Sequence, residues 1–464
     1  MSTSRVRGID PRVVAVIGVA AVAVAAIVIP GLARADAGPP IVITHGGVYS
    51  GSYASSDPQT PAVTIATSEP VVLDGASVEG PGTMIQVAVG TPADVTVRNT
   101  KGHGTAGNSG VARFLVIDSG WRSLVVENNE LDSTSGIWAH AARPSTVRVT
   151  GNRVQEIVGS GFVQFLQFDD VVGPIDVGWN EVVNTPGKSH VEDVISLYRS
   201  GGTTSARASI HDNFIWGAYP NPIDATYSGG GIMVGDRGSA VGHVDVTANQ
   251  VVGTTNYGIS VVCGSDSAVV GNTIISSGRT AKGTTIPAVN VGLSMGSEAR
   301  WGGGCTTYAG NTATGNDLGW QQATSRNDRW TPDCAACTAN TSRPGTITYA
   351  DEQAEARRWQ ARSSAQAIGP VPGPPTTLAP PSTTTPTSTS TSTTPPTTTT
   401  PTPTTDPQPP TTTTPTTTTP TTTPTDPATG GDSSELQALR DEIAALRRQL
   451  DELRTQVEAL QRGG

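Results

Sequence analysis

The amino-acid sequence predicts an all-β protein whose short strands form coils stacked along one axis. From Ala62 onward, short β-branched runs recur between Gly, Asn, Asp and Ser residues. They share one pattern, apolar–x–apolar–x–x–Asn–x–apolar, with Asn residues about 23 to 39 positions apart, which is the range of a solenoid repeat. Between the repeats there is no helical periodicity of any length.

The Asn of each repeat is expected at a corner between two strands. Asn tolerates the left-handed backbone conformation of a sharp corner, and stacked Asn side chains can form a hydrogen-bonded ladder between coils. The predicted corner residues are Asn129, Asn152, Asn180, Asn213, Asn249, Asn272 and, in a weakened last copy, Asn311. A β-sandwich or propeller is the alternative, but two-residue hairpin signals are few.

The repeat resembles the right-handed parallel β-helix proteins of the pectate-lyase-like group over roughly residues 41–316. The resemblance implies an all-β, right-handed parallel β-helix, which we expect to span residues 38–345. It implies no single activity, because one fold hosts many functions. The motif sets of galacturonan hydrolases and pectate lyases are incomplete here, so no residue role is transferred from them.

The segment before the repeat is typical of export. Three Arg residues precede a continuous apolar run at residues 13–29, and Ala33-Arg34-Ala35 supplies the small residues of a cleavage site. We expect residues 1–35 to be a signal peptide, with an uncleaved membrane anchor as the alternative. Either way the remainder would be secreted or on the cell surface.

Three further segments follow the repeat. Residues 346–368 are expected to form a short helical cap, because an open coil end leaves strand groups unpaired. Residues 369–431 are nearly all Thr, Pro and Ser and predict a disordered linker. Residues 432–462 have an unbroken apolar 3–4 spacing and predict a coiled coil. It would self-associate through residues 436–460, as a dimer or a trimer; a single amphipathic helix is the alternative.

The four cysteines allow three pairings. We favour Cys263 with Cys305 and Cys334 with Cys337 as structural disulfides, which fit an exported protein. The Cys-Ala-Ala-Cys spacing also suits a redox motif or half of a zinc site, although no second close pair supports zinc.

The balance of charge excludes one class of partner. The formal net charge is −10 and no basic block is present, so the chain lacks the clustered Lys and Arg that nucleic-acid binding needs.

The run of residues 187–202 is the strongest candidate site, because it concentrates ionisable groups in a chain otherwise poor in them. Stacked strands bring equivalent positions of neighbouring coils about 4.8 Å apart, which places Tyr198 beside Asp236 and near Asp169 and Asp170. The candidate catalytic residues are Lys188, His190, Glu192, Asp193, Arg199 and Asp236. The candidate substrate-binding residues are Trp138, Tyr198, Trp216, Tyr219 and Arg237, with Tyr227 as a further aromatic platform.

Such a groove suits a sugar polymer, because aromatic faces stack on sugar rings and charged groups hold hydroxyls or uronates. Hydrolysis would use two carboxylates, and eliminative cleavage would use a base with a cation or Ca²⁺. We therefore predict recognition, and lyase or hydrolase cleavage, of an extracellular or cell-envelope polysaccharide. The alternative is a non-enzymatic surface module, in which the same charges are pairs between coils.

Overall fold

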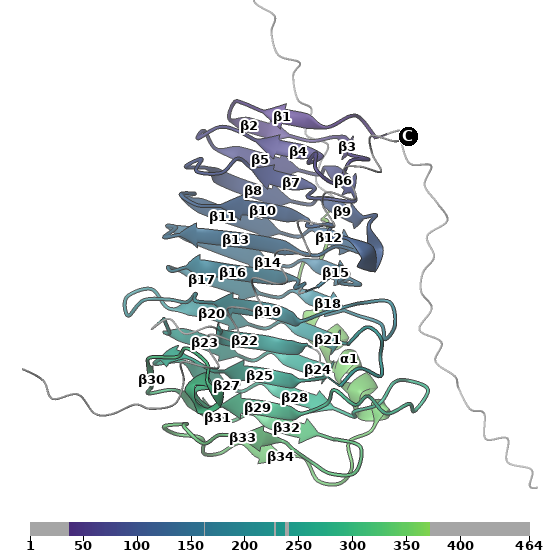
Figure 1. The fold of residues 1–464 in the computed structure, drawn as a ribbon, viewed down its shortest axis with the longest axis vertical. Coiled ribbons are helices and arrows are strands. Elements are labelled where there is room, and N and C mark those ends of the chain that lie inside the picture. The colour runs from purple at the N-terminus through teal and green to yellow at the C-terminus, as the bar shows by residue number, and fades with distance from the viewer. Residues whose placement is uncertain (1–36, 162, 227–228, 237–240, 372–464) are drawn as a thin grey trace, which may run out of the picture. The chain divides into compact units, whose positions relative to one another are not determined.

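The chain forms coils, and each coil places a strand beside the equivalent strand of the coil before it (Figure 1). The computed structural model describes residues 37–161, 163–226, 229–236 and 241–371. The first coil contains β1 (Ile41–Ile43), β2 (Gly47–Tyr49) and β3 (Ser52–Ala54), and β4 (Val63–Ile65) then lies parallel to β1. Repetition of this path gives three long sheets of parallel strands in the described residues. The resemblance to right-handed parallel β-helix proteins is confirmed.

The three long sheets are called sheets I, II and III. Sheet I consists of β1, β4, β7 (Ile85–Val87), β10 (Leu115–Asp118), β13 (Ile137–Ala142), β16 (Leu166–Val171), β19 (Asp193–Tyr198), β22 (Gly230–Asp236), β25 (Tyr257–Val261), β29 (Val291–Met295) and β33 (Arg329–Trp330). Sheet II consists of β2, β5 (Val71–Asp74), β8 (Asp94–Arg98), β11 (Ser123–Glu127), β14 (Thr146–Thr150), β17 (Ile175–Gly178), β20 (Ala208–His211), β23 (Val244–Thr247), β27 (Ala268–Val270) and β31 (Thr312–Thr314). Sheet III consists of β3, β6 (Ser77–Gly80), β9 (Lys101–Gly104), β12 (Glu130–Asp132), β15 (Arg153–Gln155), β18 (Glu181–Val183), β21 (Phe214–Ala218), β24 (Gln250–Thr254), β28 (Thr273–Ser276), β32 (Asp317–Trp320) and β34 (Thr341–Ser342).

The remaining elements are small. A two-stranded sheet joins β26 (Gly264–Ser265) to β30 (Tyr308–Ala309). Two 3₁₀ turns, η1 (Gly107–Ser109) and η2 (Glu298–Trp301), interrupt connections between strands, and α1 (Tyr349–Ser363) follows the last strand. In the described part of the chain, no helix combines the length and the apolar character needed to cross a bilayer.

The core is a set of apolar rows that run along the axis of the coils. Strand residues alternate between the interior and the outer face, and parallel pairing stacks equivalent positions. One interior row of sheet I consists of Val63, Ile85, Leu115, Ile137, Leu166, Ile195, Ile232, Ile259 and Leu293, all buried. Stacked aliphatic side chains of this kind fill the interior with few voids.

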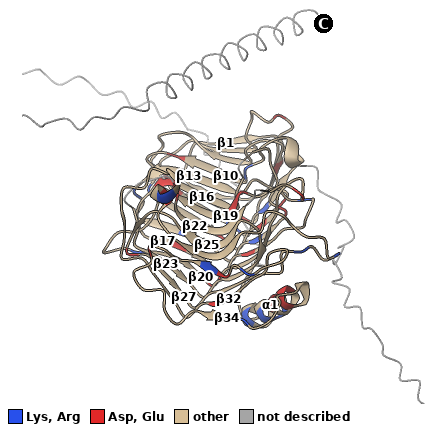
Figure 2. Ribbon diagram, turned by 60° about the horizontal axis from the view of Figure 1, so that its bottom comes forward, with Lys and Arg blue, Asp and Glu red and all other residues tan. Residues whose placement is uncertain are grey.

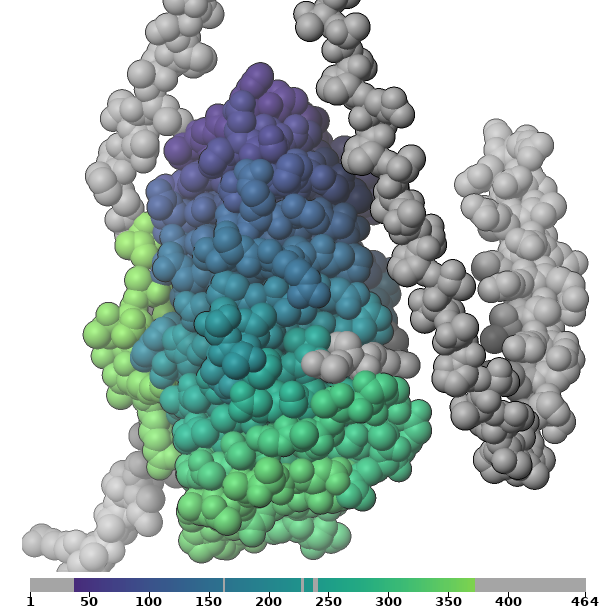
Figure 3. Space-filling model, turned by 90° about the vertical axis from the view of Figure 1, so that its left-hand side faces the viewer, coloured from purple at the N-terminus to yellow at the C-terminus, as the bar shows by residue number. Residues whose placement is uncertain are grey.

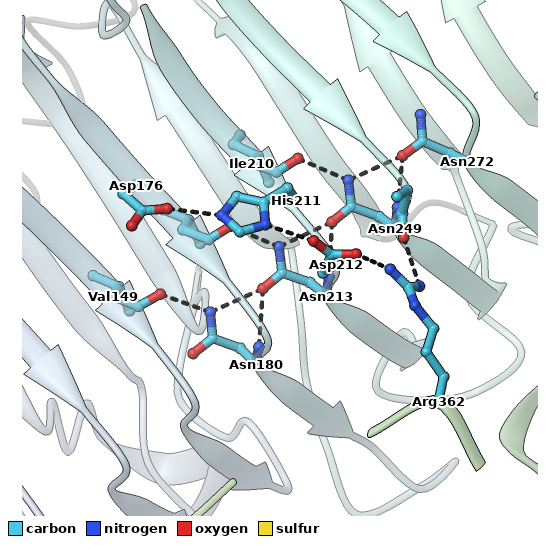
Figure 4. Close-up of polar contacts among 12 residues, drawn as sticks. Val149, Asp176, Asn180, Ile210, His211, Asp212, Asn213, Asn249, Asn272 and Arg362 are labelled. Carbon is cyan, nitrogen blue, oxygen red and sulfur yellow. Dashed lines mark hydrogen bonds and ion pairs between the residues drawn. The ribbon is translucent and has the colours of Figure 1, made fainter. Parts of the chain in front are cut away.

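An Asn ladder runs along the corner between sheets II and III (Figure 4). Each Asn donates from Nδ2 to Oδ1 of the Asn in the next coil at 2.7–3.0 Å, through Asn129, Asn152, Asn180, Asn213, Asn249, Asn272, Asn316 and Asn340. The predicted ladder is thus confirmed from Asn129 to Asn272. The backbone conformation was predicted wrongly, because the left-handed residue precedes each Asn, as at Trp179 (φ 56°) and Asp212 (φ 52°).

The predicted last rung, Asn311, is also wrong. Asn311 lies before β31, where it accepts from the Ser267 amide at 2.9 Å and donates to the Gly264 carbonyl at 3.0 Å. Asn316 lies after β31 and takes the ladder position, 44 residues beyond Asn272. The long excursion between β29 and β30 lengthens this coil, so the repeat pattern is displaced.

Helix α1 lies against the flank of sheet III, whereas the sequence led us to expect a cap over the coil end. Trp359 stacks on Phe214, with ring centroids 5.5 Å apart, and its Nε1 donates to Glu181 at 2.7 Å. The helix also carries acidic and basic residues (Figure 2). Arg362 bonds Asp212, which in turn contacts His211, held on its other side by Asp176 (Figure 4). The outward aromatic side chains of sheet III explain this position, because α1 packs on them and removes them from water.

Beyond α1 the chain runs back toward the first coils (Figure 3). The Ala367 carbonyl accepts from Asn128 at 2.6 Å, the Gly369 amide donates to the Gly151 carbonyl at 2.8 Å, and the Val371 amide donates to Asn99 at 3.1 Å. These contacts attach residues 367–371 to the outside of the Asn corner.

Both favoured disulfides are present, between Cys263 and Cys305 and between Cys334 and Cys337. The expected signal segment at residues 1–35, the coiled coil at residues 432–462 and residues 372–431 of the Thr/Pro-rich linker lie outside the described residues. Those expectations stay predictions.

Candidate functional site

An unbroken row of outward side chains crosses seven coils of sheet I. Its members alternate with the interior apolar row and pair strand by strand. They are Trp138, Gln167, Ser196, Met233, Ser260, Ser294 and Trp330. The row continues through Val116, Gln86, Thr64 and Val42 toward the first coil. Between its two indoles the side chains are small or flexible, so this stretch forms a flat floor along the coil axis.

A second outward row lies two residues further along each strand. It contains Asp118, His140, Asp169, Tyr198 and Asp236. The register between β19 and β22 shifts after Leu197, so that Asp236 rather than Gly235 opposes Tyr198. Gly235 has a φ of 81°, and a Cβ there would lie 2.1 Å from the Cys263 carbonyl oxygen, so only glycine fits this bulge. The predicted pairing of Tyr198 with Asp236 is present.

Ionisable groups meet at the ends of β13, β16 and β19, and we call them the His140 cluster: Asp118, His140, Asp169, Asp170, Tyr198 and Arg199. His140 Nδ1 lies 2.6 Å from Asp118, and His140 Nε2 lies 4.0 Å from Asp170. Arg199 donates to Asp170 at 2.9 and 2.5 Å and to Asp169 at 3.0 Å. Its guanidinium also lies over the Tyr198 ring, 4.5 Å from the centroid.

Backbone geometry brings Asp170 and Arg199 into this cluster. Each follows a residue of the second row and has left-handed backbone, with φ of 56° and 48°. Ser119 and Ala141 occupy the same position in the two preceding coils, with φ of 46° and 47°. Four stacked non-glycine residues in this conformation are an unusual local cost, and the turn they share places Arg199 directly beside Asp170.

Asp169 is the most sheltered carboxyl of the cluster. Burial raises the pKa of Asp169, while the Arg199 guanidinium and His140 act in the opposite direction. Trp138 shields the same region, since its ring stacks on His140 with centroids 5.2 Å apart and planes 9° apart. The cluster therefore combines a carboxyl whose pKa burial raises, Asp169, with a second carboxyl, Asp170, bound by two guanidinium nitrogens.

A pocket of about 500 Å³ lies on the same face, over β22, β25, β29 and β33. We call it the Trp301 pocket. Its aromatic wall is formed by Trp301 and Trp330, with ring centroids 5.5 Å apart. The other lining residues are Met233, Asp236, Asn256, Tyr257, Ser260, Val262, Asn290, Val291, Ser294, Glu298 and Asn327. Asp236 belongs to the second row, so the pocket and the His140 cluster occupy one continuous surface.

The excursion that carries Trp301 is fixed at several points. Cys305 is bonded to Cys263 beyond the end of β25. Arg300 binds Asp333 through Nε at 2.6 Å and also through Nη2, and the Ser297 amide donates to the same carboxylate at 2.9 Å. Gly296 allows Trp330 to lie against the backbone, because a Cβ at Gly296 would approach the indole to 2.3 Å.

The predicted residues before β19 lie at the opposite edge of sheet I from Tyr198 and Arg199. Lys188 is exposed, in a turn between β18 and β19. His190 Nδ1 lies 2.9 Å from the Gly159 carbonyl, and Glu192 accepts from Gln164 at 2.7 Å. Because β19 rises about 3.3 Å per residue, this group and the His140 cluster are separated by the length of the strand.

Asp193 points into the coil rather than out of it. It alternates with the inward residues Ile195 and Leu197, and its carboxylate accepts from the Tyr257 hydroxyl and from the Gly230 amide at 3.1 Å. Burial raises the pKa of Asp193 to about 6, with the Tyr257 hydrogen bond opposing that rise. Its contacts are those of an internal structural acid.

Two predicted aromatic platforms are also elsewhere. Trp216 is on sheet III beside α1, with its ring centroid 6.0 Å from that of Tyr349. Tyr219 is 3% exposed and packs in the core. Trp138 and Tyr198 do face outward on sheet I, whereas Arg237 and Tyr227 lie outside the described residues.

Several site residues were not among the candidates from sequence, including His140, Asp118, Trp301, Trp330 and Glu298. A signal for the first two exists in hindsight: the strand endings Leu-Val-Ile-Asp118, Ile-Trp-Ala-His140, Leu-Gln-Phe-Asp169 and Ile-Ser-Leu-Tyr198 share one pattern. No repeat marks Trp301, which belongs to an irregular excursion.

One potential metal-ligating group of three occurs in the described residues. The ligand atoms of His140, Asp169 and Asp170 lie within 4.8 Å of one another. Ca²⁺ prefers six to eight oxygen ligands, and this group offers one nitrogen with two carboxylates that already bind Arg199. The group suits acid–base chemistry better than it suits the Ca²⁺ ion considered for eliminative cleavage.

Comparisons with known proteins add one remote structural likeness. No protein-family model matches the chain, and no curated protein matches it in sequence. A solved structure that it resembles is the A-module of a mannuronan C-5 epimerase from Azotobacter vinelandii, with 14% identity, a TM-score of 0.21, and coverage of 66% of this chain and 91% of that one. No residue role is transferred at this similarity. The three parallel sheets and the internal Asn ladder make the chain a parallel β-helix protein.

Proposed function

We propose that this protein binds a polysaccharide along the outer face of sheet I and hydrolyses a glycosidic bond at the His140 cluster. The observation that carries the proposal is the unbroken outward row from Trp138 to Trp330. Six steps between strands at about 4.8 Å give a floor about 29 Å long. A long, narrow floor with one indole at Trp138 and another at Trp330 suits an extended chain of sugar rings, since aromatic faces pack against apolar faces of ligands.

Hydrolysis agrees with the cluster better than elimination does. Hydrolysis needs one protonated and one ionised carboxyl. Burial raises the pKa of Asp169 although Arg199 donates to it once, whereas Asp170 receives two hydrogen bonds from the same guanidinium. Elimination from a uronate needs a positive charge for the substrate carboxylate. The guanidinium of Arg199 is already bound to two carboxylates of the chain.

The catalytic roles proposed for the cluster are these. Asp169 donates a proton to the leaving glycosidic oxygen. Asp170 attacks the anomeric carbon as the glycosidic bond breaks, and a water molecule deprotonated by Asp169 then hydrolyses the glycosyl ester and releases the sugar. Asp118 orients His140 through the 2.6 Å contact. Oxygens of Asp169 and Asp170 lie within 4.8 Å, nearer the roughly 5 Å spacing of double displacement than the 6.5–9.5 Å that leaves room for an attacking water.

A polysaccharide panel tests the reaction type directly. Neutral and uronic polymers are incubated with the protein, and reducing ends and unsaturated-product absorbance are both recorded. We expect new reducing ends without unsaturated product, lost in Asp169→Asn and Asp170→Asn but kept in Lys188→Ala, which changes an exposed residue at the opposite edge. Unsaturated product would replace hydrolysis with elimination, and cleavage that survives Asp169→Asn would overturn the assigned roles.

The second candidate is a binding module without catalysis. It is favoured by the mutual pairing inside the cluster, where His140 meets Asp118 and Arg199 meets Asp169 and Asp170. Such contacts are the ordinary fate of facing charges on stacked strands. Polysaccharide binding that forms no product and is unchanged in Asp169→Asn would establish this alternative.

We also propose that the protein works outside the cytoplasm and self-associates. The two disulfides support an oxidising compartment. Self-association rests on the heptad pattern at residues 436–460. Removing residues from Asp432 onward should convert the protein to a monomer in sedimentation velocity. If the truncated protein keeps the oligomeric state of the full chain, the coiled coil is refuted.

A further inference from the structure

We infer that the Trp301 pocket is a separate subsite for an uncharged sugar ring, held in shape by the Cys263–Cys305 disulfide. The inference deepens the proposed polysaccharide binding and rests on it, but it does not require hydrolysis. The Trp301 pocket, its preference for an uncharged sugar and its support by the disulfide can each be tested.

The aromatic wall is the first reason. Trp301 is 57% exposed and Trp330 is 38% exposed, and no other Trp in the described residues is classed as exposed. Their rings lie 5.5 Å apart at 45° to each other. Two adjacent exposed indoles have a large apolar area that a stacked ring would remove from water. Large exposed apolar groups gathered in a pocket mark binding sites more often than isolated ones do.

The polar lining is the second reason. Ser260 and Ser294 form the floor, as members of the outward row. Asn256, Asn290 and Asn327 line its side, with Asn290 Nδ2 3.4 Å from Asn256 Oδ1 and Asn327 Nδ2 2.9 Å from the Asn290 carbonyl. Amide and hydroxyl groups offer both donors and acceptors, which is what the hydroxyl groups of a sugar need.

The charge of the lining selects among sugars. The charged residues that line the pocket in the described chain are Asp236 and Glu298, with no Lys or Arg. Carboxylate groups on ligands are usually held by Arg forks, and nearby Arg300 is bidentate on Asp333. A uronate here would meet carboxylates instead of a cation. An uncharged hexopyranose or pentopyranose avoids that repulsion.

The disulfide supports the wall from one side. Cys305 closes the excursion that contains Trp301 onto Cys263, 42 residues earlier. Arg300 and Ser297 attach the same excursion to Asp333 on the other side. A platform with fixed rings loses less conformational entropy when it binds, so breaking the disulfide should weaken binding without removing any ligand contact.

The position of Trp330 gives the subsite a role in the whole face. Trp330 is the last member of the outward row in the described residues, and five steps between strands separate β33 from the Asp169 strand, about 24 Å. A polymer that reaches both points would be anchored far from the reacting bond. Loss of the subsite should therefore weaken the binding of long oligosaccharides and leave the affinity for short ones unchanged.

Calorimetric titration with defined oligosaccharides tests the inference. Cello-, manno- and xylohexaose are compared with hexagalacturonate on the full chain, and on Trp301→Ala, Trp330→Ala and the double variant Cys263→Ser/Cys305→Ser. We expect at least one neutral hexaose to bind, with a tenfold or greater loss of affinity in each Trp variant and a threefold or greater loss in the Cys variant. Trp216→Phe, on the opposite flank, is the aromatic control and should bind normally. Thermal unfolding of each variant confirms that it is folded.

The outcomes separate this inference from the proposed function. Trp-dependent binding of a neutral hexaose with no cleavage would support the subsite and refute hydrolysis. Cleavage with normal binding in Trp301→Ala and Trp330→Ala would refute the subsite and leave hydrolysis standing. Preferential binding of hexagalacturonate, or no binding of any hexaose, would overturn the inference.

Discussion

The indole of Trp138 lies parallel to the imidazole of His140, at 5.2 Å between centroids and 9° between planes. The two residues are two positions apart on β13, so both face outward. The indole covers one face of the imidazole, while Asp118 binds its Nδ1. Trp138 therefore links the outward row of sheet I to the His140 cluster.

Replacing Trp138 should weaken both binding and turnover. We expect Trp138→Ala to lower affinity for the best polysaccharide about fivefold, because an aromatic stacking contact is worth about 1 kcal/mol. It should also lower kcat, since His140 loses its packing. Trp138→Phe should restore most of both values. Steady-state kinetics and titration measure the two effects, and normal values in Trp138→Ala would contradict the stacking role.

The pKa direction of Asp169 gives a pH dependence of catalysis. A general acid acts only while protonated, and burial raises the pKa of Asp169. Rate should therefore fall as pH rises through that pKa. The measurement is kcat against pH for the wild type on the polysaccharide, and for Asp169→Asn on a substrate whose chemically activated leaving group needs no proton donor. The basic limb should vanish in the variant, and its persistence would assign the limb to another group.

The Asn ladder should be worth several kcal/mol at each internal rung. Asn213 donates to Asn249 and to the Val177 carbonyl, and it accepts from the amide and the side chain of Asn180. Asn213→Ala leaves these buried partners unsatisfied, at about 1–3 kcal/mol for each group affected. We expect a loss of at least about 2 kcal/mol in urea unfolding. Asn340→Ala, at the half-buried last rung, is the matched control and should cost less.

Helix α1 should be docked less firmly at alkaline pH. Burial raises the pKa of Glu352 from 4.5 to about 7, with the hydrogen bond from Ser277 opposing the rise. A raised folded-state pKa means that stability is fully present below the unfolded value and is lost as pH increases through about 7. The difference corresponds to about 3 kcal/mol.

Hydrogen exchange of α1 at pH 5 and pH 8 measures that change. Protection should decrease at pH 8 in the wild type and change little in Glu352→Gln. Equal protection of the wild-type helix at both pH values would contradict a protonated Glu352 in the docked state.

Asp193 should prove structural. Its carboxylate accepts from Tyr257 and from the Gly230 amide inside the coil, and burial raises its pKa to about 6. Asp193→Asn keeps an acceptor oxygen and removes the titration. We expect cleavage and binding to be unchanged. Between about pH 4 and pH 6 the wild type should lose stability as pH rises, because the folded carboxyl keeps the proton that the unfolded one has released, and this loss should be smaller in Asp193→Asn. Loss of turnover in a folded Asp193→Asn protein would restore it to the catalytic group.

The fold could be predicted from sequence because its determinants are local and repeated. Each of the rungs from Asn129 to Asn272 lies in the same short pattern, and the interior row needs only alternating apolar residues. The prediction failed at Asn311, where a long excursion displaces the repeat. It also misplaced α1, because Trp179 lies in the corner before sheet III, Phe214 and Trp216 are on β21, and only their arrangement in space shows a helix-binding surface.

The site was harder to predict, because loop lengths between strands vary and decide which edge a residue reaches. Tyr198 and Asp236 could be aligned from their strand pattern. Lys188 and Arg199 are close in sequence, yet the strand between them takes them to opposite edges of sheet I. Trp301 depends on a disulfide-closed excursion that no repeat describes. Local pattern therefore predicts the scaffold, whereas the site depends on the irregular segments.

The return of residues 367–371 to the first coils has a mechanical consequence. Gly38 is hydrogen-bonded to Ser52 in the first coil, and Val371 to Asn99 two coils later. Residues 367–371 are hydrogen-bonded to the coils of β8, β11 and β14, so a pulling force applied through Val371 would load those bonds before it reached α1 and the last coils. The coils that carry Trp301 and Trp330 would thus lie last on the path of the load.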